Sequence, residues 1–219
     1  MALFRVVVRE GLQRASLRTV ADEAAPNVGS LRHYFASQQD LMRFAMQSML
    51  DRVGARLLAH VEHAGGLEGR PRAEQLALAE GLLAELLPLD DQRRAEATLF
   101  LDFNTAARTN PALGDLSRQA AEGTRSLVRR VLDRPDASGV LRPGLGPDVE
   151  TERLTALLDG LGQGGVLQPS IVDPRTCAEV LRASGGPGRA RRGGGRRQMR
   201  ERGAARPPRA QRRTNVRMR

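Results

Sequence analysis

Apolar residues recur along this chain at the three- and four-residue spacing of amphipathic helices, from the N-terminus to about residue 183. No segment of useful length alternates apolar and polar residues as a strand would, so the predicted fold class is all-α. Prolines and glycines interrupt the pattern and separate the helices. The spacing predicts helices near residues 2–10, 16–24, 28–34, 38–64, 72–87, 91–109, 111–133, 149–163 and 174–183.

The first three predicted helices are short, and only residues 25–27 separate the second helix from the third. Two short helices across such a turn are typical of a helix-turn-helix unit, although they also occur at the corner of an ordinary helical bundle. Their apolar residues can pack against the first helix, which leaves a small polar face with one cation pointing outward. Such a face can enter a DNA major groove. Its residues are Asn27, Gly29, Ser30, Arg32, His33 and Tyr34.

Polar residues mark the start of two of these helices. Ser16 is the predicted N-cap of the second helix. Ser37 and Asp40, three residues apart, resemble a capping box and predict the start of the long helix that follows.

The segment from Ser16 to Leu41 resembles the N-terminal signature of the TetR family of transcriptional regulators. The resemblance is carried by a Ser-capped helix with a Val-Ala pair, by the residues from Asn27 to Phe35, and by Ser37 with Asp40 and Leu41. Departures from this signature bear on DNA affinity, and one of them is Gln38 in place of a lysine that commonly contacts phosphate in the family. Residues 25–27 read Ala-Pro-Asn where the family has Gly-Val-Ser, and Arg32 stands where the family has an aromatic residue.

This resemblance implies a DNA-binding domain over residues 1–45, with Gly29 allowing close approach of the backbone to DNA. The base readers it implies are Ser30, Arg32 and His33, and the phosphate contacts are Ser16, Thr19 and Tyr34. Tyr34 is alternatively a packed aromatic side chain. Asn27, in the turn, completes the predicted DNA-contacting set.

Residues 46–183 correspond, by the same resemblance, to a helical ligand-binding and dimerisation domain. Apolar residues and polar anchors at helical spacing suggest a pocket formed by Phe100, Phe103, Asn104 and Arg108, unless they are plain core and solvated surface. A stripe of leucines is the predicted dimer interface, or alternatively an ordinary core stripe of this chain. Its members are Leu154, Leu157, Leu158 and Leu161.

Residues 184–219 differ sharply from the rest, because glycine, proline and arginine dominate and apolar residues nearly vanish. We expect this tail to be disordered. Its 13 arginines and single acid, Glu201, give the tail a larger positive charge than the net charge of +10 of the whole chain. The rest of the chain is therefore slightly acidic. The tail is a nonspecific polyanion-binding arm, an inert extension, or a frame-shifted or read-through product.

Other chemistry receives little support. His60 and His63 have a helical metal-binding spacing but no third ligand nearby, and the glycine-rich run at 162–165 indicates a helix end rather than a phosphate loop. We therefore expect no metal, cofactor or catalytic site. A single cysteine, Cys177, and the lack of an apolar run long enough to span a membrane favour the cytoplasm.

The sequence thus predicts a homodimeric repressor that binds a palindromic DNA operator and is released by a small-molecule effector. The alternative is a protein that binds nucleic acid nonspecifically through its basic tail. The two hypotheses predict opposite effects of removing residues 1–45 or 184–219.

Overall fold

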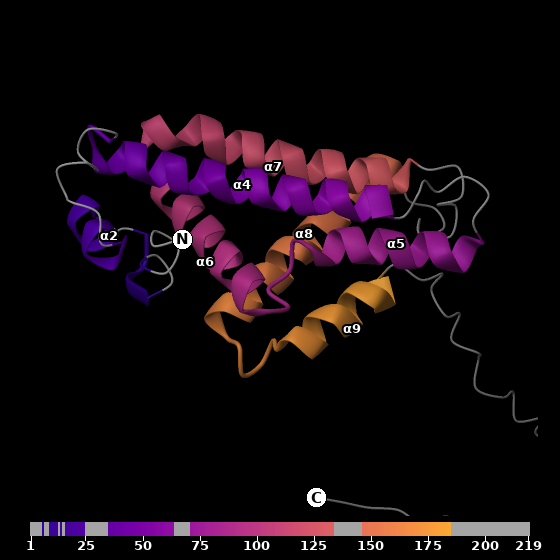
Figure 1. Cartoon of the computed structure of the whole chain (residues 1–219). Coiled ribbons are helices and arrows are strands. Elements are labelled where there is room, and N and C mark those ends of the chain that lie inside the picture. Colours follow the sequence, from indigo (N-terminus) through magenta and orange to yellow (C-terminus); the bar gives the residue numbers. More distant parts are fainter. Residues whose placement is uncertain are drawn as a thin grey trace, which may run out of the picture. The chain divides into compact units, whose positions relative to one another are not determined.

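Helices make up every regular element in the part of the chain that the computed structural model describes, which confirms the all-α fold class. All of that part belongs to one compact unit, Met1–Gly188. The described residues are 6, 9–12, 14, 16–24, 35–63, 71–133 and 146–184. The helices in Figure 1 are α2 (Leu17–Ala24), α4 (Gln38–His63), α5 (Arg72–Ala84), α6 (Asp91–Ala107), α7 (Pro111–Leu132), α8 (Pro147–Leu167) and α9 (Pro174–Ser184).

The predicted capping box at the start of α4 is confirmed. The backbone N–H of Ser37 donates to the Asp40 carboxylate at 2.9 Å, and the N–H of Asp40 donates to the Ser37 hydroxyl at 3.1 Å. The two bonds satisfy backbone donors that a helix N-terminus leaves unpaired, so this long helix begins where the sequence indicates.

The predicted end of the helix at residues 162–165 is wrong, because α8 continues through all four residues to Leu167. Packing explains the difference. A Cβ atom on Gly165 would lie 2.6 Å from Cγ of Pro88, and one on Gly164 would lie 3.0 Å from Val172. The glycines therefore let other segments approach the helix closely, and this tertiary contact overrides their low helix propensity.

Helix α5 ends three residues earlier than the sequence predicts, at Ala84. The backbone N–H groups of Leu86 and Leu87 donate to carbonyls three residues back, at 3.1 Å each, so the chain tightens into turns before α6 begins. This tightening sets the side chains of Glu85 and Leu86 at the end of α5, where both line the cavity described below.

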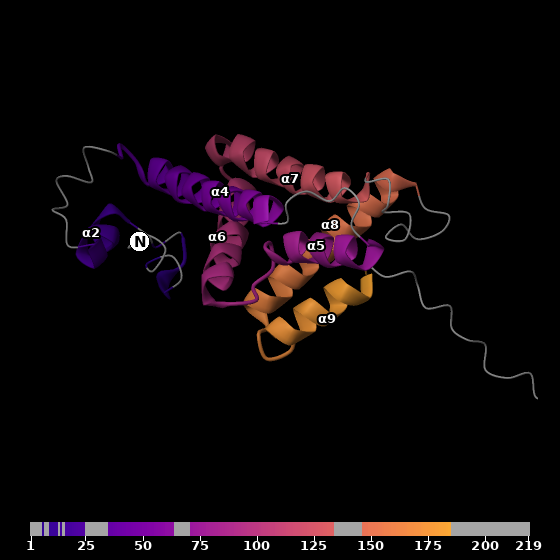
Figure 2. The ribbon, with the colours of Figure 1, turned by 45° about the vertical axis from the view of Figure 1, so that its right-hand side comes forward.

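One core cluster joins the N-terminal residues to the long helices. Val6, Leu12 and Val20 are buried to 5% exposure or less, and they share the cluster with residues of α4, α6 and α7. Helix α7 lies alongside α4 in the views of both Figure 1 and Figure 2. The members from these long helices include Leu41, Ala45, Met46, Leu99, Phe103 and Leu113.

The second core cluster lies among α5, α7, α8 and α9, and it contains the leucine stripe of α8. Leu154, Leu158 and Leu161 retain 1%, 4% and 8% exposure within a single chain. The assignment of this stripe to a dimer interface is therefore wrong, since its side chains are already buried against their own chain. Partners in this cluster include Leu83, Leu87, Val128, Val131, Cys177 and Leu181.

Across the described ranges, no helix combines the length and the apolar character that crossing a bilayer requires.

Candidate functional site

Two regions were candidates for function from the sequence, and the structure describes them unequally. Of the predicted DNA-contacting residues, only Ser16 and Thr19 are described. The others, which include the predicted base readers, lie outside the described residues: Asn27, Gly29, Ser30, Arg32, His33 and Tyr34.

Ser16 and Thr19 hold the start of α2 together. The Thr19 N–H donates to the Ser16 hydroxyl at 3.1 Å, and the Ser16 N–H donates to the Thr19 hydroxyl at 2.8 Å. The predicted N-cap role of Ser16 is thereby confirmed. Both residues are partly exposed at this helix end, and their role in contacting phosphate stays a prediction.

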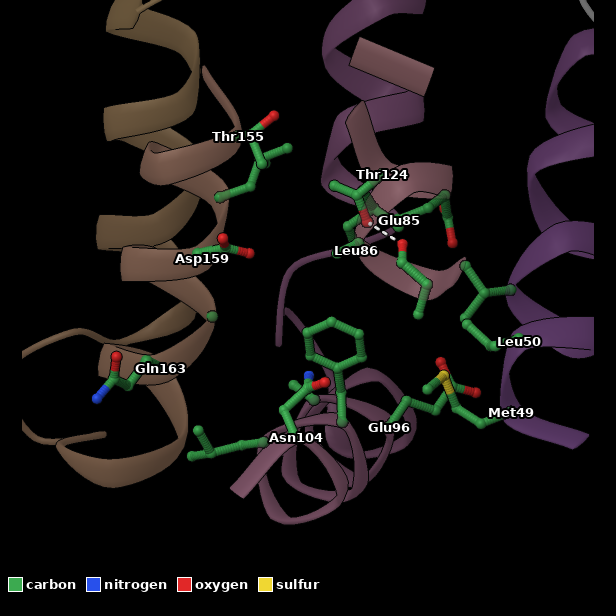
Figure 3. A pocket seen from close by; sticks show the side chains of 18 of the residues that line it. Met49, Leu50, Glu85, Leu86, Glu96, Asn104, Thr124, Thr155, Asp159 and Gln163 are labelled. Atoms are coloured by element: carbon green, nitrogen blue, oxygen red, sulfur yellow. Dashed lines mark hydrogen bonds between the residues drawn. The ribbon is translucent and has the colours of Figure 1, made fainter. Parts of the chain in front are cut away.

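A cavity of about 420 Å³ lies among α4, α6, α7, α8 and the turn after α5 (Figure 3). This volume falls in the range of sites that bind small organic molecules. Much of its wall is apolar, with polar groups confined to a few places, as is typical of a ligand pocket. The apolar wall includes Met49, Leu50, Leu86, Phe100, Leu101 and Leu158.

The structure divides the four predicted pocket residues into two pairs. Phe100 and Asn104, one helical turn apart on α6, line the cavity. Phe103 is fully buried in the first core cluster, and Arg108 is exposed just beyond the end of α6. The Asn104 side-chain oxygen accepts a 2.5 Å hydrogen bond from the Ser117 hydroxyl, which fixes the amide at the cavity wall.

Sequence reasoning missed the polar row that α8 contributes to the cavity. Thr155, Asp159 and Gln163 recur every four residues and line the cavity, and Figure 3 shows them along one helix. The signal was present in the sequence as a polar row beside the leucines of the same helix. A polar row on a helix usually indicates a solvated face, so periodicity alone did not reveal it as a cavity wall.

An ion-pair network lies at another edge of the cavity and joins three helical segments. The Arg56 guanidinium of α4 donates to Glu85 at 2.9 Å and to both carboxylate oxygens of Glu96 at 2.7 and 3.0 Å. Glu96 is 4% exposed, and its hydrogen bond is the largest cause of the raised pKa of Arg56. Arg93 adds a second contact to Glu85 at 3.4 Å. The negative charges of both glutamates are thus compensated within the protein.

Asp159 stands in a different electrostatic environment. No ion pair to its carboxylate is present among the described residues. Asp159 is exposed at the edge of the cavity, and partial desolvation there raises its pKa. Arg125 opposes this rise, but its guanidinium is engaged by Glu152 through two hydrogen bonds of 2.7 and 3.1 Å. Asp159 therefore places an incompletely compensated negative charge on the cavity wall.

Helix α6 connects the cavity to the N-terminal residues. Phe100 and Asn104 line the cavity from this helix, while the Asp102 carboxylate accepts a 2.9 Å hydrogen bond from the Leu12 N–H. That bond follows Gly11, whose φ of 81° suits glycine and turns the chain toward α6. A shift of α6 would therefore move groups at both places.

The two histidines of α4, His60 and His63, contact other residues of the protein. His63 Nδ1 contacts the carbonyl oxygen of Ala59 at 2.6 Å, and a Cβ atom on Gly81 would lie 2.6 Å from the His60 ring, so that ring packs on α5. The described part of the chain holds no group of three metal-ligating side chains.

Comparison with known proteins gives a consistent result. Residues 77–184 match the family described as the C-terminal part of BetI-type transcriptional repressors. The HTH-type transcriptional regulator PksA of Bacillus subtilis is 31% identical over 180 residues, which cover 82% of each chain.

Solved structures show the same arrangement of helices. A transcriptional regulator from Rhodococcus superposes with a TM-score of 0.68 at 27% identity, covering 84% of this chain and 89% of that one. A putative transcriptional regulator from Saccharomonospora viridis, solved in complex with choline, gives a TM-score of 0.69 at 21% identity, covering 82% of this chain and 89% of that one. The second likeness concerns the fold alone.

Proposed function

This chain belongs to the TetR family of transcriptional regulators, and on that premise we propose that it represses genes by binding an operator and releases it when a small molecule enters the cavity. The N-terminal helices would read the DNA, with Ser30, Arg32 and His33 as base readers. The cavity among α4, α6, α7 and α8 would hold the effector.

The single observation that carries this proposal is the double role of α6. The helix lines the cavity through Phe100 and Asn104, and it holds the N-terminal residues through Asp102 and through Phe103 in the shared core. A ligand that favours one position of α6 can therefore bias the N-terminal helices, which is the differential contact that allosteric coupling requires.

The proposal includes a two-fold dimer, since one short recognition helix reads only a few base pairs. Because the leucine stripe is buried, we assign the interface to the outer face of α8. Val149 and Leu167 are each 57% exposed at its two ends, and Ala156 and Gly160 lie exposed between them. Small residues there let a second helix approach closely.

The dimer assignment is tested by placing a charge on that face. Ala156→Arg should give a folded monomer in light scattering, whereas Leu58→Arg on the exposed surface of α4 should leave the dimer intact. A dimer that survives Ala156→Arg would exclude this face.

Operator binding is tested by selecting DNA sites from a random pool with the purified chain and measuring affinity for the selected site. Arg32→Ala should weaken binding by about 1–3 kcal/mol and relax one base position. A chain ending at Ala183 should retain its sequence preference while losing affinity for random DNA at low salt. If truncation of the tail abolishes site discrimination while the helices remain intact, the result supports the alternative that the chain binds nucleic acid through its basic tail.

A further inference from the structure

The cavity face of α8 presents two polar groups one helical turn apart. Thr155 and Asp159 both line the cavity, and Figure 3 shows them across from Met49 and Leu50 of α4. Residues four apart on a helix have their Cβ atoms roughly 5–6 Å from each other, so one small group can contact both side chains. Met49 and Leu50 make that part of the opposite wall apolar, and the cation that lines the cavity nearest in its effect on Asp159 is Arg125.

The Thr155 hydroxyl is buried without a hydrogen-bond partner among the described residues, although the side chain is only 2% exposed. Buried hydroxyls rarely remain unpaired, because the lost hydration is costly. Four other helical threonines in the described ranges avoid this by donating to the carbonyl four residues back. They are Thr98, Thr105, Thr124 and Thr151. Thr155 differs from these threonines, because its side chain lines the cavity while its hydroxyl oxygen is covered and has no partner among the described residues. A threonine in a helix has two accessible χ1 rotamers, so a change of rotamer would present this hydroxyl to a ligand.

Among the described charged groups around the cavity, one carboxylate has no ion pair. Glu85 and Glu96 are compensated by Arg56, with Arg93 adding to Glu85. Arg125 also lines the cavity, and its charge is compensated by Glu152, which lies outside the cavity wall. Asp159 remains without an ion pair among the described residues, so the ligand-facing surface favours a positive charge.

We propose that the effector is a primary or secondary amine with an apolar body, held by its ammonium N–H groups between the Asp159 carboxylate and the Thr155 hydroxyl. The inference rests on the proposed function, because it names the ligand class of the same cavity. The carboxylate selects a cation over a neutral or anionic molecule. The hydroxyl oxygen selects a cation that carries N–H donors, because a quaternary ammonium has none to offer.

The probes are four molecules with the same apolar body and different head groups: 4-phenylbutylamine, its trimethylammonium analogue, 4-phenylbutanol and 4-phenylbutanoate. Calorimetric titration of the full chain at pH 7.5 should find the amine tightest, by about 10- to 100-fold over the alcohol. The trimethylammonium compound should fall between the two, and the carboxylate should bind most weakly. Equal affinity for amine and alcohol, or tighter binding of the carboxylate, would overturn the proposal.

Asp159→Asn should lower amine affinity by about 10- to 100-fold and leave alcohol affinity unchanged, since only a charged hydrogen bond is lost. The matched control is Asp148→Asn, the same change at an exposed position of the same helix that does not line this cavity. Asp148→Asn should bind the amine as the parent chain does. Equal losses in the two variants would mean that the effect is a general one of charge.

Thr155→Val removes the hydroxyl and keeps the shape of the side chain. It should weaken binding of the amine by about 2- to 10-fold and leave binding of the trimethylammonium compound unchanged. Thr155→Ser should restore the affinity for the amine. If Thr155 had a purely structural role, Thr155→Val would change the affinities for both cations equally. That outcome would overturn the role of Thr155 in recognition.

Binding is measured on the protein alone, so the two proposals can fail separately. If the amine binds through Asp159 but does not release the selected operator, the ligand class stands and the effector-controlled function fails. If a different class of molecule releases the operator and the amine does not bind, the function stands and the ligand class fails.

Discussion

Two walls of one cavity treat charge in opposite ways. Beside α4 and α6, Arg56 and Glu96 form a closed network in which the carboxylate accepts two guanidinium hydrogen bonds, and Glu96 is 4% exposed. On α8, Asp159 lacks an ion pair among the described residues, and Thr155 one turn away lacks any hydrogen-bond partner there. Buried charges that satisfy each other hold helices together, whereas unsatisfied groups are available to a ligand. The difference therefore separates a structural wall from a recognition wall.

The largest expected effect comes from breaking the closed wall. Arg56→Ala leaves Glu96 buried without its cationic partner, with only the Gln92 amide still donating to it at 3.3 Å, and should lower the free energy of unfolding by about 3 kcal/mol, as measured by urea denaturation. Arg118→Ala is the control, because its ion pairs with Asp115 and Glu122 are exposed; it should change stability by less than about 1 kcal/mol. Similar losses in the two variants would mean that the Arg56 network is no more than a surface ion pair.

The second prediction asks which wall transmits the ligand signal. Helix α6 belongs to the closed wall and reaches Leu12 through Asp102, so Asp102→Ala should reduce the coupling between effector and operator by about 0.5–2 kcal/mol. The coupling is the ratio of operator affinities measured with and without a saturating effector. Asp115→Ala, exposed on α7, should leave that ratio unchanged. Unchanged coupling in Asp102→Ala would remove this hydrogen bond from the route.

The third prediction compares two buried threonines of α8 whose hydroxyls differ in what they contact. Thr155→Val removes an unpaired buried hydroxyl and should stabilise the protein by about 1 kcal/mol. Thr151→Val removes a hydroxyl that donates to the Pro147 carbonyl at 2.8 Å, so it should stabilise less or destabilise. Thermal unfolding of both variants gives the sign. A change in stability of the same sign and size in both variants would show that the missing hydrogen bond of the Thr155 hydroxyl does not destabilise the protein.

The sequence predicts the helices well because their apolar periodicity and their caps are local features. Ser37 and Asp40, three residues apart, are enough to place the start of α4. The end of α8 could not be predicted, since it depends on Pro88 packing on Gly165 from a segment nearly eighty residues away. Local pattern therefore determines where helices occur, and tertiary contact determines some of their ends.

The candidate site was only partly accessible from the sequence. Phe100 and Phe103 are equally apolar and lie on the same helix, yet one lines the cavity and the other fills the core. Periodicity identifies an apolar face but not the neighbour against which each part of it packs. The pairing of Arg56 with Glu96 spans forty residues, and no motif announces it. The unpaired state of Asp159 becomes visible only once the cations around it are known to be engaged elsewhere.

The smallest expected effect lies in how stability changes with pH. The pKa of Asp159 is raised by desolvation, so its folded state binds a proton more readily than its unfolded state does. The contribution of Asp159 to stability should therefore fall as pH rises from about 4 through the raised pKa, and then level off. Asp173 provides the contrast, because the Thr176 N–H bonds its carboxylate and lowers its pKa. The stability that Asp173 contributes should be lost as pH falls.

These opposite slopes can be measured as differences between the parent chain and Asp159→Asn or Asp173→Asn at pH 4.5 and 7.5, which cancel the titration of the other carboxylates. The effect of Asp159 should stay within about 0.5 kcal/mol, because water reaches part of the group and Arg125 offsets the desolvation while Glu152 adds to it. A saturating amine should cancel the Asp159 slope, since a bound ammonium favours the ionised carboxylate and lowers its pKa. If the slope remains the same with the amine bound, the ammonium does not contact Asp159, and the α8 wall would resemble the closed wall in having no role in recognition.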